Sequence, residues 1–265
     1  MTSPAIRSAL ADIATAGGFF DVEVTEPTNA PSGSTDGEWL ALAQLYNDSA
    51  VLAQRISAIR DRLATRANRD VADIEPRVAA SIMYQGLASR LLSPAIGTAV
   101  AHGLVYEAET LRWQPPQDGP VPLWLAEDRA VATGQAPAET ISTCLLEAVF
   151  EPLIAAVRTQ VKLAPGLLWG NLASSVSGAS QRLGQLRPEL APAAHRLAEN
   201  LLNTEFLAGR GEFVRPFTER PQATFFVRRT CCLYYRIPNN GKCGDCALLS
   251  PQNRRAQWQR AAGIR

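Results

Sequence analysis

Histidine is scarce in this chain of 265 residues, which has only His102 and His195. Uninterrupted apolar runs are short as well, far below the ~18 residues of a membrane-spanning helix, so we expect no transmembrane segment. Residues 1–11 lack the charged start and apolar stretch of a secretory signal, which predicts a cytoplasmic protein. Thiols stay reduced in that compartment, so clustered cysteines there favour metal or redox chemistry over structural disulfides.

The glycine-rich motifs of nucleotide-binding proteins are also absent. There is no Gly-x-Gly-x-x-Gly run followed by a helix and no P-loop, so we expect the chain to bind neither a nicotinamide nor a flavin. We expect no nucleic-acid partner either. Apolar residues make up 46% of the chain and charged residues 19%, which is ordinary for a globular protein with a sizeable core.

Cysteine is concentrated near the C-terminus, where four of the five cysteines stand as Cys231, Cys232, Cys243 and Cys246. Between the two pairs, residues 237–241 read Ile-Pro-Asn-Asn-Gly. This run predicts a tight turn, because proline fixes φ while asparagine and glycine accept a positive φ. The turn would fold the chain back so that the two pairs face one another. The stretch therefore predicts a four-cysteine metal site.

The spacing of the cysteines bears on which metal they hold. Four thiolates suit either tetrahedral zinc or an iron–sulfur cluster. Adjacent side chains on an extended chain point to opposite faces, so Cys231 and Cys232 would reach one small ion only with strain. A two-iron cluster is wider and accepts an adjacent pair more easily, which favours [2Fe–2S] and leaves zinc open. With no histidine near the cysteines, a Rieske centre is not expected.

Positive charge is concentrated in the same part of the chain. Residues 225–265 hold eight basic residues and one acid, which leaves 18 basic and 24 acidic residues before them. Basic surroundings stabilise thiolates and offset the negative charge of a cysteine-ligated cluster. We expect the cations nearest the cysteines to raise the cluster potential or to dock a partner, the alternative being a solvated basic tail: Arg228, Arg229, Arg236 and Lys242.

The rest of the sequence predicts a helix-rich α+β fold. Apolar residues recur at helical spacing in several stretches, which predict helices at residues 4–14, 38–65, 76–102, 140–162, 192–202 and 251–262, with helical sequence also after Val176 to about Leu183. Breaks or kinks are expected at Asn47-Asp48-Ser49, Ser93-Pro94 and Pro152. Strand-like sequence lies at residues 104–113 and 121–125, as a hairpin, and at 213–214 and 224–227.

This pattern predicts N-terminal helices, a small antiparallel sheet region and a C-terminal cysteine hairpin followed by a helix. The predicted domains are an N-terminal extension and loop at residues 1–37, a helix-rich substrate-binding region at 38–220 and a cluster-binding module at 221–265. The fifth cysteine, Cys144, lies on the apolar side of a predicted helix and is expected in the core.

The cysteine spacing is similar to that of a known family. Cys-Cys-x10-Cys-x2-Cys, set within Arg-Arg-Thr-Cys-Cys-Leu-Tyr-Tyr-Arg and Cys-Gly-Asp-Cys-Ala-Leu, resembles the C-terminal signature of the FhuF-type ferric siderophore reductases. Trp169-Gly170-Asn171 and the stretch at 77–94 also resemble that family, so the likeness spans roughly residues 75–250. Ala247 departs from the pattern, in which proline more often follows the last cysteine, and this is not expected to affect ligation.

The resemblance implies an activity, a cofactor and partners. It implies that the four C-terminal cysteines bind a [2Fe–2S] cluster that passes one electron to an Fe(III)-siderophore of the hydroxamate type, releasing Fe(II) in the cytoplasm. Hard oxygen donors bind Fe³⁺ tightly and Fe²⁺ weakly, so one electron releases the metal. Electrons would come from an external donor such as a ferredoxin or a flavodoxin-like protein. Backbone N–H groups at 233–236 and 244–247 are candidate donors to the sulfurs.

Two residues upstream are further candidates for substrate contact. Trp169 is a candidate for lining a siderophore pocket, with core packing as the alternative. Asn171 beside it is a candidate contact or helix cap. Two other functions stay open: a non-catalytic zinc or iron–sulfur protein whose hairpin organises partner binding, and an electron relay in another pathway.

Overall fold

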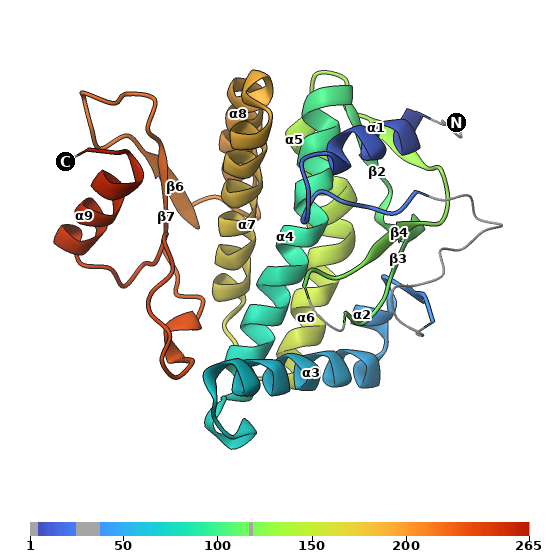
Figure 1. Ribbon diagram of the computed structural model, residues 1–265. Coiled ribbons are helices and arrows are strands. Elements are labelled where there is room, and N and C mark those ends of the chain that lie inside the picture. The colour runs from blue at the N-terminus through green and yellow to red at the C-terminus, as the bar shows by residue number, and fades with distance from the viewer. Residues whose placement is uncertain (1–4, 25–37, 117–118, 265) are drawn as a thin grey trace.

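The computed structural model describes residues 5–24, 38–116 and 119–264 (Figure 1). The predicted loop before residue 38 falls mostly outside these ranges. The α-helices are α1 (Ala5–Ala14), α2 (Gln44–Asn47), α3 (Ser49–Ala67), α4 (Pro76–His102), α5 (Pro137–Ile141), α6 (Glu151–Gln160), α7 (Pro165–Leu186), α8 (Ala191–Leu202) and α9 (Pro251–Ala261). The strands are β1 (Leu40–Ala41), β2 (Leu104–Tyr106), β3 (Leu111–Trp113), β4 (Leu123–Leu125), β5 (Ala130–Ala132), β6 (Gly211–Val214) and β7 (Phe225–Arg228). The predicted helix-rich α+β class is confirmed.

Helix α4 is the centre of the fold. It packs most extensively against α7 and also contacts α3, α1 and α8. Most of its residues are buried, and many of them are small, which lets α7 and α1 approach closely. Figure 1 shows α3 crossing the lower end of α4, with β2, β3 and β4 on one side of α4 and α7 and α8 on the other.

The predicted break at Ser93-Pro94 is wrong, because α4 continues through both residues. A proline inside a helix removes one backbone hydrogen bond and costs ~3 kcal/mol. Here Pro94 is buried in the centre of the core, where the packing of α4 outweighs that cost. The Ser93 hydroxyl also donates to the Ser89 carbonyl at 2.7 Å. Gly103 ends the helix with a φ of 65°, as predicted.

The structure divides the predicted helix at residues 38–65 into a strand and two helices. The stretch begins as strand β1, which pairs antiparallel with β3 and places Leu40 opposite Trp113. Helices α2 and α3 then follow with a break at the predicted position. The Asp48 carboxylate caps α3 by accepting hydrogen bonds from the Ala50 and Val51 N–H groups at 2.9 and 3.2 Å.

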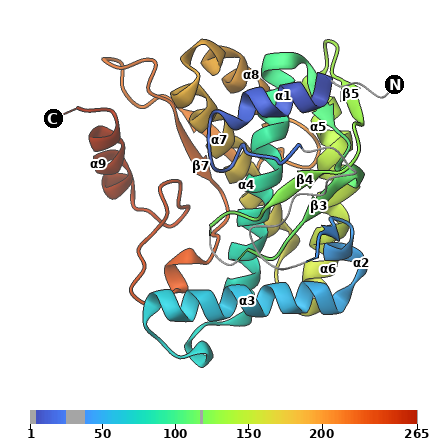
Figure 2. The same cartoon turned by 45° about the vertical axis from the view of Figure 1, so that its right-hand side comes forward.

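The strands form three small antiparallel groups. The predicted hairpin of β3 and β4 is present, with β1 on its other edge, whereas β2 pairs with β5 instead. Strands β6 and β7 pair near the C-terminus and place Gly211 opposite Arg228. The predicted domain boundary at residue 220 falls between these two paired strands, and the division into domains stays a prediction. Figures 1 and 2 both show α9 on the outer side of β7, away from α4.

The segment Pro137–Gln160 is the one helical stretch of the described residues that is long and apolar enough to span a membrane, judged by length and composition alone. The segment consists of α5, a π-helix at Ser142–Phe150 and α6. Pro152, where a break or kink is predicted, lies in the first turn of α6. Leu145, Leu146 and Phe150 are fully buried in the core. These inward side chains of the segment therefore belong to the core.

Candidate metal centre

The four C-terminal cysteines lie on one hairpin that follows β7 directly. Its tip is the predicted turn at residues 237–241, where the Asn240 N–H donates to the Ile237 carbonyl at 3.1 Å. Asn239 adopts a φ of 65°, which asparagine tolerates better than most residues. Local turn chemistry therefore returns the chain so that Cys243 meets Cys232.

The hairpin is held against the helical body by contacts with distant residues. The Ser81 hydroxyl of α4 donates to the Cys232 carbonyl at 2.8 Å. Arg236 forms a 3.1 Å ion pair with Glu75, just before α4 begins. On the outer side, Arg254 of α9 donates to the Cys246 carbonyl at 3.1 Å. Both arms of the hairpin are thus fixed by residues outside it.

Two of the four sulfur atoms lie close together. Cys232 Sγ and Cys243 Sγ are 3.7 Å apart, and two ligands of one tetrahedral metal with ~2.3 Å bonds lie ~3.8 Å apart. Among the described residues, no three His, Cys, Asp or Glu side chains converge on one point. One preformed pair at this separation suits two thiolates on one tetrahedral metal, whether that metal is zinc or one iron of a cluster in which each iron takes two thiolates.

Backbone N–H groups point at two of the sulfurs. The Leu233 N–H donates to Cys231 Sγ at 3.3 Å, and the Leu248 N–H donates to Cys246 Sγ at 3.4 Å. Leu233 adopts a φ of 67°, a strained conformation for a leucine. The first donor lies within the predicted range 233–236, and the second lies one residue beyond the predicted range 244–247. Such bonds stabilise thiolates and tune cluster potentials.

The thiols differ in their affinity for protons. The hydrogen bond with Cys243 lowers the pKa of Cys232 to about 6, and the same contact raises the pKa of Cys243. The pair thus prefers to hold a single proton. Burial raises the pKa of Cys231, and the Leu233 N–H and the Arg228 guanidinium oppose that effect. A thiolate is therefore available at Cys232 near neutral pH.

A buried arginine lies beneath the hairpin. The Arg228 side chain is 0% exposed, and its Nη2 donates to Asn171 Oδ1 at 2.6 Å. Its Nε lies 3.8 Å from Asp245 Oδ2. In the part of the chain that the structure describes, Nε and Nη1 have no hydrogen-bond partner. Buried guanidinium donors are normally satisfied, so this cation fits a site built for an anionic group.

Arg228 belongs to a network that joins α4, α7 and the cysteine loops. The Asn171 amide donates to the Ser81 hydroxyl at 3.0 Å, and Ser81 in turn donates to Cys232. The Ser174 hydroxyl donates to the Asp245 carboxylate at 2.5 Å. Asp245 lies between Cys243 and Cys246, so the network reaches both cysteine pairs.

The predicted site residues other than the cysteines fall into two groups. Arg229, Arg236 and Lys242 are at the surface; Arg229 pairs with Glu212 at 3.2 Å, and Lys242 Nζ donates to the Leu248 carbonyl at 2.6 Å. Arg228 is buried, so its position favours the predicted effect on the cluster potential, and docking through Arg228 stays a prediction. Arg228 is the last residue of β7 and points inward, whereas Arg229 follows the end of the strand and is exposed.

The two upstream candidates, Trp169 and Asn171, both contact other side chains of the protein. Trp169 is half-buried and its ring stacks on Phe206, with the ring centroids 4.9 Å apart. Asn171 is fully buried within the Arg228 network. Substrate contact by either residue stays a prediction, whereas their roles in packing and in holding Arg228 are given by these contacts.

Gly170, between these two residues, is where α7 touches the cysteine segment. A Cβ atom at Gly170 would lie 1.9 Å from Thr230 Oγ1, and Thr230 directly precedes Cys231. Any larger residue at position 170 would therefore push the cysteine segment away from α7.

Gly170→Ala is accordingly expected to lower both stability and cluster content. Overpacking of this kind costs ~1–3 kcal/mol, and here the displaced strand carries two cysteines. The measurements are the melting temperature and the iron content per chain. Gly178→Ala on the same helix is the matched control, because its Cβ would meet no atom within 4 Å. Equal melting temperatures and iron contents in the two variants would show that the close approach is unimportant.

Comparison with known families gives one match in this region. Residues 228–248 match the family described as the FhuF 2Fe-2S C-terminal domain. The matched segment begins at Arg228 and contains all four cysteines. Comparison with curated proteins gives no match. Residues 228–248 are therefore similar to the FhuF 2Fe-2S C-terminal domain, and this similarity supports a [2Fe–2S] cluster as the cofactor.

Proposed function

We propose that this protein is a ferric siderophore reductase whose cluster is held by Cys231, Cys232, Cys243 and Cys246. The observation that carries the proposal is the cysteine hairpin, which matches a 2Fe-2S domain and lies over a buried cation. Cys232 and Cys243, with sulfurs 3.7 Å apart, would share one iron. Cys231 and Cys246 would then bind the second iron.

The proposed reaction is the reduction of siderophore-bound iron(III) to iron(II). A bound [2Fe–2S] cluster supplies one electron at a time. Hydroxamate oxygens are hard donors that suit Fe³⁺ much better than Fe²⁺, so reduction weakens the chelate and frees the metal. Arg228 would favour the extra negative charge that the site gains on reduction, because its guanidinium is buried and held in place by Asn171.

The electron donor is proposed to be a separate ferredoxin or flavodoxin-like protein in the cytoplasm. Donors of that kind are often acidic, and opposite charges speed and orient protein encounters. Arg229, Arg236 and Lys242 offer a basic surface beside the cysteines. Arg229 and Arg236 already pair with Glu212 and Glu75, so their contribution would come from exchanging those surface ion pairs.

Chelate-dependent reoxidation tests the activity. The cluster-loaded protein is reduced without oxygen and mixed with a ferric tris-hydroxamate in the presence of a coloured Fe(II) trap. We expect the oxidised visible spectrum to return as one Fe(II) is trapped per cluster. The gallium(III) chelate, which takes up no electron, is the control and should leave the cluster reduced. A cluster that stays reduced with the ferric chelate would contradict the reductase and favour an electron relay.

A further inference from the structure

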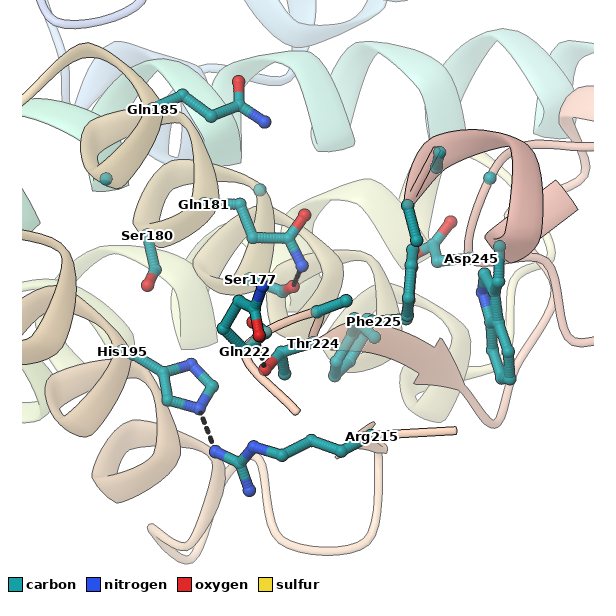
Figure 3. A pocket seen from close by; sticks show the side chains of 18 of the residues that line it. Ser177, Ser180, Gln181, Gln185, His195, Arg215, Gln222, Thr224, Phe225 and Asp245 are labelled. Carbon is teal, nitrogen blue, oxygen red and sulfur yellow. Dashed lines mark hydrogen bonds between the residues drawn. The ribbon is translucent and has the colours of Figure 1, made fainter. Parts of the chain in front are cut away.

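A cleft of about 800 Å³ separates α7 and α8 from β7 and α9 (Figure 3). Small-molecule sites typically measure ~300–1,000 Å³, so the cleft has room for a chelate rather than for a single ion. It lies on the side of α7 that faces the C-terminal segment.

The cleft reaches the cysteine loop. Gly244 and Asp245 form part of its wall, and these are the two residues between Cys243 and Cys246. Neighbouring Cα atoms are ~3.8 Å apart, so a molecule resting on Gly244 lies about one residue from a proposed cluster ligand. The cleft therefore provides a direct approach from solvent to the metal centre.

The wall of the cleft that α7 forms is polar but uncharged. Helix α7 contributes serine hydroxyls and glutamine amides, and Figure 3 shows the Gln181 side chain reaching into the cleft. The Gln181 amide makes only a long contact of 3.4 Å to the Ser177 hydroxyl, so it can reorient toward a ligand. The opposite wall is aromatic: Phe225 and Trp258 stack with their centroids 5.2 Å apart.

Few charges line the cleft. Its ionisable lining residues are Arg215, His195 and Asp245. Arg215 donates to His195 Nε2 at 2.9 Å and lies 3.6 Å from the Glu199 carboxylate. The Glu199 carboxylate therefore partly offsets the positive charge of Arg215. Asp245, at the cysteine end, is a carboxylate. These residues do not form the group of cations that a multiply charged anion requires.

We infer that this cleft binds the ferric chelate and selects one whose net charge is close to zero; the inference rests on the proposed function. Iron(III) with three singly charged hydroxamates is neutral, whereas three doubly charged catecholates leave a charge of about −3. Hydroxyl and amide groups on α7 suit the hydroxamate oxygens, and the Phe225–Trp258 wall suits apolar linkers. One electron passes from the reduced cluster, which is thereby oxidised, to the bound iron(III), which becomes iron(II), and no atom is exchanged in that step.

Filling the cleft tests this inference. Gly178 lies on the α7 wall, is exposed, and would place a Cβ in open space. Gly178→Trp should therefore fold and occupy the cleft. Gly86→Trp is the matched control, because Gly86 is also an exposed helical glycine with open space at Cβ and does not line the cleft. Melting temperature and visible spectrum establish that both cluster-loaded variants are folded.

Binding is measured by calorimetry with gallium(III) chelates, which are not reduced. We expect the wild type and Gly86→Trp to bind the neutral tris-hydroxamate equally, and Gly178→Trp to bind it at least about tenfold more weakly. The wild type should bind the triply anionic tris-catecholate at least about tenfold more weakly than the tris-hydroxamate. Equal binding by Gly178→Trp overturns the location of the site, and equal binding of the two chelates overturns selection by charge.

Reoxidation of the reduced cluster by the ferric tris-hydroxamate separates this inference from the proposed function. Slower reoxidation in Gly178→Trp than in Gly86→Trp supports the cleft as the place of reduction. Equal rates in both variants mean that the chelate is reduced elsewhere, which overturns the cleft and leaves the reductase intact. If even the wild type is not reoxidised, the proposed function fails, and the gallium measurements still decide whether the cleft binds the neutral chelate.

Discussion

Serine in place of any one of Cys231, Cys232, Cys243 or Cys246 is expected to abolish the visible absorption of the [2Fe–2S] cluster. A serine hydroxyl stays protonated at neutral pH and is a poor substitute for the soft thiolate that iron–sulfur clusters require. The loss should be most complete at Cys232 and Cys246, which are 3% and 2% exposed. Water cannot readily replace a missing ligand at these two positions.

The measurement is iron and sulfide content per chain together with the visible spectrum. Cys144→Ser is the control: Cys144 lies in the π-helix Ser142–Phe150 and is half-buried against the core. It should keep the full cluster and change the free energy of unfolding by no more than ~1–2 kcal/mol. A variant at any of the four positions that retains full iron and sulfide would remove that residue from the ligand set.

The cysteine hairpin could be predicted from the sequence because its determinants are local. Pro238, Asn239 and Gly241 specify a turn through their own backbone preferences, whatever surrounds them. The spacing of the cysteines then fixes which of them can meet. The observed Cys232–Cys243 contact joins the two arms on either side of this turn.

Tertiary contacts override local rules elsewhere in the fold. Pro94 weakens a helix locally, yet α4 continues through it because the helix is enclosed by α7, α1 and α8. Leu40 belongs to a helical pattern, yet it pairs with Trp113, 73 residues further along the chain. Neither outcome is encoded within a window of a few residues.

The strand period separates Arg228 from Arg229 but does not show which of them points inward. Side chains alternate along a strand, so Arg228 shares a face with Phe226, whereas Arg229 follows on the other side. Phe225 and Phe226 are both apolar, so only the structure shows that the buried face is that of Phe226 and Arg228. The cleft left no sequence signal, because its walls come from α7, α8, β7 and α9 and meet only in the folded chain.

Arg228→Met is expected to destabilise the protein and lower the reduction potential of the cluster. Methionine keeps much of the volume but removes the charge, which leaves the Asp245 carboxylate and the Asn171 amide without their partner. Breaking a buried ion pair in this way typically costs ~3–5 kcal/mol, or roughly 6–15 °C in the melting temperature of a domain of this size. Differential scanning calorimetry of the cluster-loaded protein measures the loss.

The potential should fall because reduction adds an electron that the guanidinium charge favours. A unit charge ~8 Å away at an effective dielectric constant of ~20 contributes ~2 kcal/mol, which is ~90 mV for one electron. Redox titration of the visible spectrum measures the shift. Arg228→Lys keeps the charge without the planar fork, so it should recover most of the potential but only part of the stability. Arg229→Met removes an exposed charge from the neighbouring position and should change both quantities little. A potential that stays the same in Arg228→Met would mean that the buried cation holds the hairpin to α7 without tuning the cluster.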